Sequence, residues 1–357
     1  MIVFIVALAA VILLSTCVTT NGKGSIADKF IKQGTMVAEP FLSQRSTTII
    51  NGIFVLLIFF SHSTQYLSLS GNLLDSLYRH FQNFHNQWVV TTFLAFSGFG
   101  VMLKIMRGGV QYLNKYPRNR LLKTLVNFDI AVILFLVANS LLAIHYSGWE
   151  IAGSFIGITG IGNSNWYIFT ILVMYLVSYL AAVALKDNYK AIAMAVTVCS
   201  VAYVVIAQIT GLPSRFVSTV VTYALGMWIA VYKDELERLL KKKSLISLLV
   251  IVIPILLTYK LRGNDFIMNL NSCFFVLLVV WFMAHFETRS NILYFLGKHA
   301  FSIYILQRLP MLIISYFYTP AGVMNYVFVA MCLLITVGFA VVFDHLLKKV
   351  DRMIIKT

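Results

Sequence analysis

Long apolar runs separated by short basic segments are the feature of this chain that most restricts its fold. Eleven runs approach the length of about 20 mostly apolar residues that a helix needs to cross a bilayer. Because lipid satisfies no backbone polar groups, such runs fold as helices. Of the 357 residues, 60% are hydrophobic and 11% are charged, whereas a soluble domain has roughly a quarter charged residues. The sequence therefore predicts an all-α, polytopic membrane protein.

The loops between the runs differ in charge, which predicts the orientation of the chain. The predicted spans are 1–19, 48–67, 88–104, 124–145, 166–185, 190–210, 216–232, 245–259, 266–285, 299–318 and 323–345. Alternate loops hold most of the Lys and Arg residues, and the opposite loops hold only Arg79, Arg215, Lys260 and Arg262. Because basic loops stay in the cytoplasm, we expect about eleven transmembrane helices, with the N-terminus outside and the C-terminus inside. The net charge of +15 follows from this bias and does not indicate nucleic-acid binding.

The same runs divide the chain into four expected segments. These are an N-terminal transmembrane helix at 1–19, a cytoplasmic linker at 20–47, a transmembrane domain at 48–345 and a basic cytoplasmic tail at 346–357. The first run lacks a basic start and an A-x-A-like cleavage site, so we expect it to be retained. The four cysteines fall inside apolar runs without metal-type spacing, and we expect no metal site.

His62 is an ionisable residue whose predicted depth in the membrane needs an explanation. It follows Ser61 in NGIFVLLIFFSHSTQYL, about 21 Å along a helix that begins at Thr48. Ionisable groups at such depth are costly and mark function by default. Asn51 lies about three turns earlier and close to the same helix face. His62 is therefore a candidate catalytic residue, although a hydrogen bond to another helix explains it equally well.

Arg308 is a second polar group that we expect to lie inside a span, in FSIYILQRLPML. An arginine there needs a partner or a water-filled cavity, so it is either an anion-binding group or half of an ion pair. Asp129 and Asp344 lie near cytoplasmic ends of spans, and for them we favour a structural ion pair.

Several stretches resemble, in the same order, the landmarks of acyltransferase family 3. Asn51 and His62 have the spacing of the family's Arg-x10-His pattern, and FLAFSGFGVML is similar to its F-x-x-S-G-F-x-x segment. Arg118 and Arg120 in YPRNRLLKTL match its R-x-R motif. NSNWYIFTILVMYLVSYL and LGKHAFSIYILQRLP resemble two further helices of the family. These integral membrane enzymes O-acylate surface polysaccharides and related glycans. The resemblance implies a ten-helix core preceded by the helix at 1–19.

Two positions depart from the family pattern. The family arginine is Asn51 here, and its charge would have to come from another residue, such as Arg45, Lys123 or Arg308. The histidine of the family's I-Y-L-L-H segment is Gln307. We therefore expect His62 to be the essential residue.

The resemblance implies a membrane-embedded O-acyltransferase without a bound cofactor. Its donor would be cytoplasmic acyl-CoA, most simply acetyl-CoA, and its acceptor a hydroxyl of an extracytoplasmic glycan or cell-surface polysaccharide. The expected catalytic residues are His62, Asn51 and Ser61, with His62 acting either as general base or as a covalent acyl carrier. The expected oxyanion donors are Ser61, Asn163, Asn165, Asn269 or Asn271.

Two further groups of residues complete the expected site. The phosphates of acyl-CoA would contact a cytoplasmic basic cluster made of Lys104, Lys115, Arg118, Arg120 and Lys123. From charge alone, this cluster is more simply a signal of orientation. The possible acceptor or anion contacts are Arg308, Gln307 and Trp166. Trp166 also suits a membrane interface without any ligand.

Two other classes of function remain open. One is a transporter or flippase for a lipid-linked glycan, and the other is a non-catalytic membrane partner of polysaccharide assembly. The absence of a visible inverted repeat disfavours a transporter, whereas Asn51 keeps the non-catalytic partner open. In each case we expect a multi-pass protein of the plasma membrane of the cell.

Overall fold

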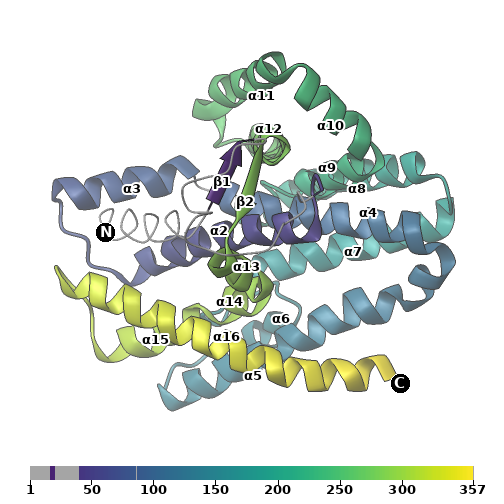
Figure 1. The fold of residues 1–357 in the computed structure, drawn as a ribbon. Helices are drawn as coiled ribbons and strands as arrows, with labels where there is room; N and C mark the ends of the chain where they lie inside the picture. Colours follow the sequence, from purple (N-terminus) through teal and green to yellow (C-terminus); the bar gives the residue numbers. More distant parts are fainter. Residues whose placement is uncertain (1–16, 21–39, 86, 357) are drawn as a thin grey trace, which may run out of the picture.

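The structure is a computed structural model that describes residues 17–20, 40–85 and 87–356. Its helices are α2 (Gln44–Ser63), α3 (Leu73–His85), α4 (Trp88–Tyr116), α5 (Lys123–Leu141), α6 (Gly148–Phe155), α7 (Trp166–Leu185), α8 (Tyr189–Ile209), α9 (Val221–Val231), α10 (Lys233–Lys242), α11 (Ser244–Thr258), α12 (Asp265–His285), α13 (Asn291–Lys298), α14 (Ala300–Leu306), α15 (Arg308–Phe317) and α16 (Met324–Lys356). The same residues also form two short strands, β1 (Cys17–Thr20) and β2 (Phe286–Arg289), and four short 3-10 or π-helical turns (Figure 1).

Nine helical runs in the described part of the chain are long and apolar enough to cross a membrane. This finding confirms a polytopic helical membrane protein, while the number of spans and their orientation stay predictions. One of the nine runs, Leu73–Leu141, contains two predicted spans. They are separated where Gly109 adopts a φ of +44°, inside α4, and by a π-helical turn at Pro117–Leu122. Glycine adopts a positive φ without steric cost, so the chain can break its helical path there.

Helices at the periphery expose apolar side chains, as lipid contact requires. On α8, Val198 and Ile209 are exposed, and on α11, Leu256 and Leu257 are exposed. In water, a continuous apolar surface of this kind would be unfavourable. These helices therefore present the surface expected of a bilayer-embedded protein.

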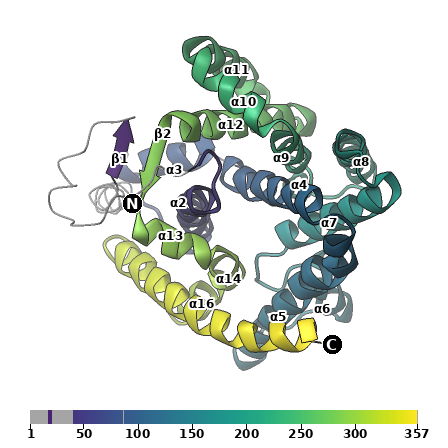
Figure 2. The same cartoon turned by 45° about the vertical axis from the view of Figure 1, so that its right-hand side comes forward.

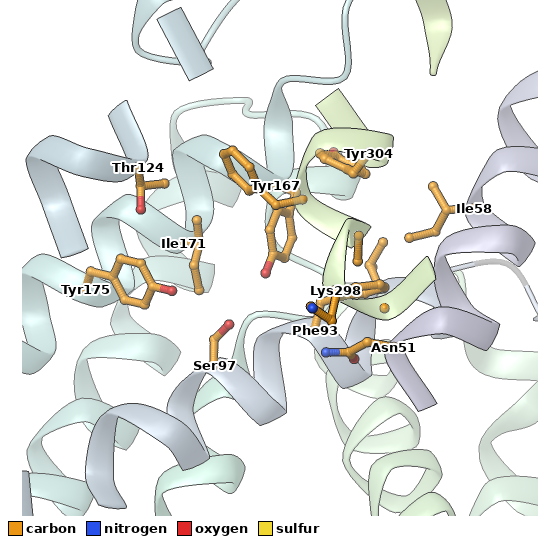
Figure 3. A pocket seen from close by; sticks show the side chains of 14 residues that line it. Asn51, Ile58, Phe93, Ser97, Thr124, Tyr167, Ile171, Tyr175, Lys298 and Tyr304 are labelled. Carbon is orange, nitrogen blue, oxygen red and sulfur yellow. The ribbon is translucent and has the colours of Figure 1, made fainter. Parts of the chain in front are cut away.

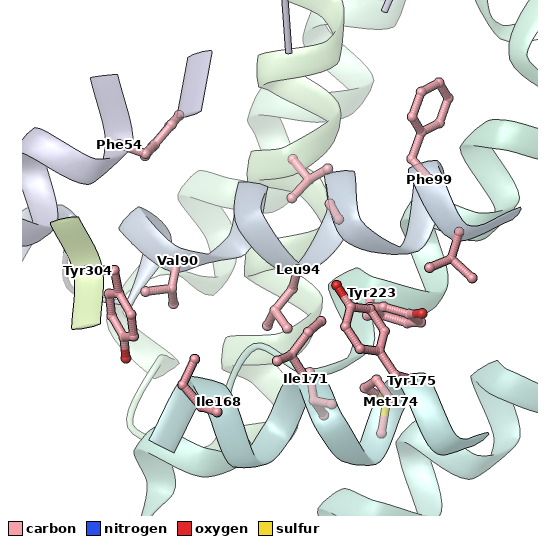
Figure 4. Packing of buried hydrophobic residues seen from close by; sticks show 14 of the residues in the cluster. Phe54, Val90, Leu94, Phe99, Ile168, Ile171, Met174, Tyr175, Tyr223 and Tyr304 are labelled. Atoms are coloured by element: carbon pink, nitrogen blue, oxygen red, sulfur yellow. The ribbon is translucent and has the colours of Figure 1, made fainter. Parts of the chain in front are cut away.

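Helices α2, α13 and α14 pack against one another and lie near the middle of the view in Figure 1. The α10–α11 pair lies at one edge of the molecule and α16 at the opposite edge, beside α14 and α5 (Figures 1 and 2). Between these edges, α4 packs along α9 and also contacts α2 and α7. Figure 4 shows the resulting core, in which Leu94 of α4 and Ile171 of α7 are both buried.

The crossing of α2 with α13 is unusually close because glycines stand at the contact. A Cβ atom added to Gly52 would lie 2.0 Å from the Leu293 carbonyl oxygen. A Cβ added to Gly297 would lie 1.8 Å from the Thr48 carbonyl oxygen. Small residues allow membrane helices to approach in this way. The crossing fixes the end of α13, including Lys298, next to the first half of α2.

Strand β1 pairs with β2 in antiparallel register, with Cys17 opposite Arg289 and Thr20 opposite Phe286. Residues 1–16 of the predicted first span lie outside the described residues. Its last residues, 17–19, form a strand and not a helix. The predicted helix therefore does not extend to residue 19, because the backbone there is paired with β2. Helix α2 begins at Gln44, so it includes the last four residues of the linker predicted at 20–47.

Candidate active site

His62 lines a polar cavity of about 610 Å³ at the C-terminal end of α2, which we call the His62 cavity. Its lining residues come from the end of α2, from α3, α4, α14 and α15, and from the segment that leads into α7. They include Ser61, His62, Ser164, Trp166, Arg215 and Arg308. Six of the predicted site residues thus lie around one cavity, although they are separated by up to 247 positions in the chain: Ser61, His62, Asn163, Asn165, Trp166 and Arg308.

The imidazole of His62 contacts two other residues of this cavity. Its Nδ1 lies 3.4 Å from the Ser164 Oγ, at the long end of hydrogen bonding. Its ring centroid lies 6.3 Å from that of Tyr304. If Ser164 accepts the Nδ1 proton, Nε2 keeps a lone pair and can take a proton from a hydroxyl group. Catalytic hydrogen bonds are often long before the substrate binds, so this contact is compatible with a base.

The segment between α6 and α7 forms one wall of the His62 cavity and is held by side-chain amides. The Asn139 amide donates to the Ile161 carbonyl at 2.8 Å, and the Asn165 amide donates to the Gly157 carbonyl at 2.9 Å. At the start of α6, the Ser147 backbone N–H and hydroxyl donate to Glu150, which lowers the pKa of that carboxyl. These contacts position Ser164 opposite His62.

Asn51 lines a second cavity, of about 270 Å³, which we call the Asn51 cavity. Most of its wall is apolar or aromatic, including Phe93, Ile171 and Phe301. Lys298 lines the same cavity and lies at the wall that holds Asn51 (Figure 3). The Asn51 Oδ1 is buried and has no hydrogen-bond partner among the described residues. The cavity thus offers a mostly apolar passage with one free acceptor and one cation.

A third cavity, of about 1040 Å³, lies between α4, α5, α13 and α16. We call it the Arg120 cavity. Its basic lining residues are Lys104, Arg120, Lys123, Lys298, His299, His345 and Lys348. The Arg120 Nε donates to the Tyr112 hydroxyl at 3.3 Å, and Lys123 pairs with Asp351 at 2.7 Å. Asp344 accepts hydrogen bonds from His299 and Ser302, while an ion pair at this position stays a prediction.

The three cavities adjoin one another because they share lining residues. The Arg120 and Asn51 cavities share Thr124, Lys298 and Phe301. The Asn51 and His62 cavities share Ile58, Val90 and Tyr304. They therefore form a series that changes from basic to apolar to polar, with Lys298 at the first junction and Tyr304 at the second.

Several predicted site residues lie elsewhere. Gln307 is fully buried, and its amide donates to the Tyr304 carbonyl at 3.1 Å, so it lines none of the three cavities. Lys115 and Arg118 are exposed outside the Arg120 cavity because the helical turn directs them away from it. Asn51 does not reach the His62 cavity, since eleven residues of helix separate it from His62 by about 16 Å.

Two predicted oxyanion donors have structural partners instead. The Asn269 amide donates to the Val217 carbonyl at 2.8 Å. Asn271 accepts from the Trp88 indole at 2.7 Å and donates to the Ile255 carbonyl at 3.0 Å. Ser61, Asn163 and Asn165 do line the His62 cavity, so these three remain candidates.

None of the three residues expected to replace the family arginine lies beside Asn51. Arg45 donates to Asn291 at 2.9 Å, Lys123 pairs with Asp351, and Arg308 lines the His62 cavity. Lys298 is the basic residue at this place. Sequence reasoning missed it because it lies one residue outside a predicted span and 247 positions from Asn51. It also missed Ser164 and Arg215 of the His62 cavity, which have no distinctive spacing in the chain.

No group of three or more His, Cys, Asp or Glu side chains could hold a metal ion in the described ranges. The residues around His62 instead provide a base, hydroxyls, amides and arginines, which suit proton transfer and polar ligands.

Comparison with known proteins identifies a family. The acyltransferase domain of acyltransferase family 3 matches residues 48–345, whereas no curated protein and no solved structure matches the chain. The match covers more than half of the chain and confirms the resemblance that the motifs indicated. The protein is therefore a membrane-bound acyltransferase that belongs to acyltransferase family 3.

Proposed function

We propose that this enzyme transfers an acyl group, most simply acetyl, from cytoplasmic acyl-CoA to a glycan hydroxyl on the other side of the plasma membrane. The observation that supports the proposal most strongly is the series of three adjoining cavities. Their linings change in the order that the three parts of the reaction need: a site for phosphates, a passage for an uncharged arm, and a polar site for a sugar.

The phosphates of acyl-CoA would bind in the Arg120 cavity. Guanidinium and ammonium groups form charge-assisted hydrogen bonds with phosphate oxygens. Arg120 is positioned for this by Tyr112 and by Tyr175, whose ring centroid lies 5.6 Å from the guanidinium carbon. Lys104 and Lys348 line the same cavity and would add to its positive field.

The pantetheine arm would extend through the Asn51 cavity. Its amides would find the free Asn51 oxygen and the Lys298 ammonium, and its methylene groups would contact the apolar wall. Lys298 would supply the positive charge that the family's arginine supplies at the position of Asn51. The thioester would then reach the wall of Ile58, Val90 and Tyr304, on whose other side His62 lies.

At His62, the acceptor hydroxyl would donate its proton to Nε2 while its oxygen attacks the thioester carbon. The new C–O bond forms, the C–S bond breaks, and the proton passes from His62 to the thiolate, which leaves as free CoA. Ser61 or the Asn163 amide would stabilise the oxyanion intermediate. In the covalent mechanism, the His62 nitrogen first attacks the thioester and CoA leaves. The acceptor hydroxyl then attacks the acyl carbon, and the bond between this carbon and His62 breaks.

The test is a transfer assay with the protein in lipid nanodiscs, where both faces are accessible. Acyl-CoA is mixed with envelope glycans from cells that lack the gene, and free CoA and glycan-bound ester are both measured. We expect one ester for each CoA released, and a loss of roughly tenfold or more in kcat/KM with Arg120→Gln. Arg107→Gln is the matched control, because Arg107 is exposed outside the three cavities. If the wild type releases no CoA, a flippase or a non-catalytic partner becomes the better assignment.

A further inference from the structure

The His62 cavity contains two arginines that have no negatively charged partner among the described residues. Arg308 is the first residue of α15, and Arg215 lies in the short 3-10 turn Ser214–Phe216. None of the described residues that line this cavity is an Asp or a Glu. Within the described ranges, neither guanidinium forms a salt bridge at 4.0 Å or less. The cavity is therefore positively charged.

Arg308 is held by a neutral residue, so its charge remains uncompensated. Its Nη2 donates to the Gln65 side-chain oxygen, and its Nε is buried without a hydrogen-bond partner among the described residues. The two residues that follow it, Leu309 and Pro310, are buried and anchor the start of α15. A fixed, partly buried arginine of this kind is costly unless an anion or water completes its contacts.

Arg215 is exposed, and its position depends on the anchored turn that carries it. Its guanidinium carbon lies 5.7 Å from the centroid of the Phe216 ring, which is buried. The Phe216 carbonyl accepts a hydrogen bond from Thr170 of α7 at 3.1 Å, which ties the turn to the helix bundle. The two arginines thus enter one cavity from separate elements, each on an anchored backbone.

Planar guanidinium groups bind carboxylates and phosphates through paired hydrogen bonds. The same cavity also contains Gln82 and Gln87, whose side chains suit the hydroxyls of a sugar. We propose that the acceptor is an anionic glycan, whose oxyanion is bound by Arg308 and Arg215 while a hydroxyl of the same molecule faces His62. This inference rests on the proposed function and narrows its acceptor. The oxyanion is either the carboxylate of an acidic sugar or a phosphate attached to the glycan.

The test is an equilibrium binding measurement that needs no turnover. Nanodisc-embedded protein, saturated with CoA to occupy the cations of the Arg120 cavity, is titrated with two pairs of probes. One pair is trigalacturonate and its uncharged methyl ester, and the other is a neutral trisaccharide with and without one phosphate. We expect at least one anionic probe to bind about tenfold or more tightly than its neutral counterpart. The pair that shows this preference identifies the source of the oxyanion.

Variants locate the preference in the cavity. Arg308→Gln and Arg215→Gln should each weaken binding of the anionic probe by about ten- to hundredfold, the range for a charged hydrogen bond. Arg308→Lys keeps the positive charge and should retain part of the affinity for the anionic probe. Arg79→Gln is the matched control, because Arg79 is an exposed arginine that donates to the Leu69 carbonyl and does not line the cavity. Thermal unfolding of each variant checks that it is folded.

Two results would overturn the inference: no anionic probe binds better than its neutral counterpart, or the preference survives in both glutamine variants. Neither result depends on acyl transfer. Release of CoA with neutral glycans alone would leave the proposed function standing and remove the anionic acceptor. Anion binding by a protein that never releases CoA would instead support the anion site and contradict the proposed acyl transfer.

Discussion

At the scale of single residues, Lys298 is a cavity residue that the sequence did not indicate as part of the site. It lines both the Arg120 and the Asn51 cavities, where acyl-CoA would pass between them. We predict that Lys298→Gln raises the KM for acyl-CoA by about ten- to hundredfold, because a charged contact is lost, and that Lys298→Arg retains most activity. Lys190→Gln is the control, since Lys190 lies outside these cavities, 5.3 Å from the Tyr232 ring. An unchanged KM in Lys298→Gln would remove this residue from the donor site.

Residues differ in how far the sequence identifies them. The sequence indicated His62 and Arg308 as candidates, because an ionisable side chain expected inside a membrane span is costly. Arg118 was predicted as a donor contact from the R-x-R motif, yet only Arg120 of that pair lines the cavity. A motif gives spacing along the chain, whereas the direction of each side chain depends on the local turn, here a π-helical one. Ser164 was not predictable, because its contact with His62 joins residues 102 positions apart.

At the scale of elements, the crossing of α2 and α13 should be the most sensitive part of the site. We predict that Gly297→Ala destabilises the protein by about 3 kcal/mol or prevents folding, because the new Cβ would meet the Thr48 carbonyl oxygen at 1.8 Å. Gly338→Ala on α16 is the matched control, because nothing lies within 4 Å of its added Cβ. Thermal unfolding in nanodiscs measures both, and equal stability of the two variants would contradict the close crossing.

Hydropathy predicted where most helices lie, because apolar length is a strong local signal. It did not predict that residues 17–19 pair with β2, since that contact joins segments 272 positions apart. The break at Gly109 lies in the loop expected between the spans 88–104 and 124–145, but hydropathy did not predict that α4 continues past this loop position to Tyr116. Features that depend on local sequence were therefore predictable, and those that depend on distant partners were not.

At the scale of the whole molecule, transfer from a cytoplasmic donor to an acceptor outside requires that the series of cavities crosses the bilayer. We predict that Lys348→Cys, in the Arg120 cavity, reacts with a membrane-impermeant maleimide only from the cytoplasmic side, because the basic loops face the cytoplasm. Asn83→Cys, in the His62 cavity, should react only from the outside. Both variants are made in a background without the native cysteines and are assayed in intact cells and inside-out vesicles. Labelling of both from one side would rule out transfer across the membrane.

No cavity was predictable as such, because each is built from elements that are distant in the chain. The Asn51 cavity, for example, combines residues of α2, α4, α5, α7, α13 and α14. The sequence indicated a base and a basic cluster, and the structure adds the apolar cavity that lies between them. Lys298 and Tyr304 line two cavities each, and these shared residues support the proposal that the three cavities act as one site.

The most direct measurement of the central claim is glycan O-acylation in cells that lack the gene, complemented with wild type or with His62→Gln at equal membrane expression. We expect His62→Gln to lower acylation by about a hundredfold or more, as the loss of a general base or acyl carrier requires. His80→Gln is the control, because His80 is an exposed histidine whose Nδ1 lies 2.8 Å from the Ser76 carbonyl oxygen, outside the His62 cavity. It should acylate as the wild type does. Full acylation by His62→Gln would contradict the account and transfer the chemistry to another residue of the cavity.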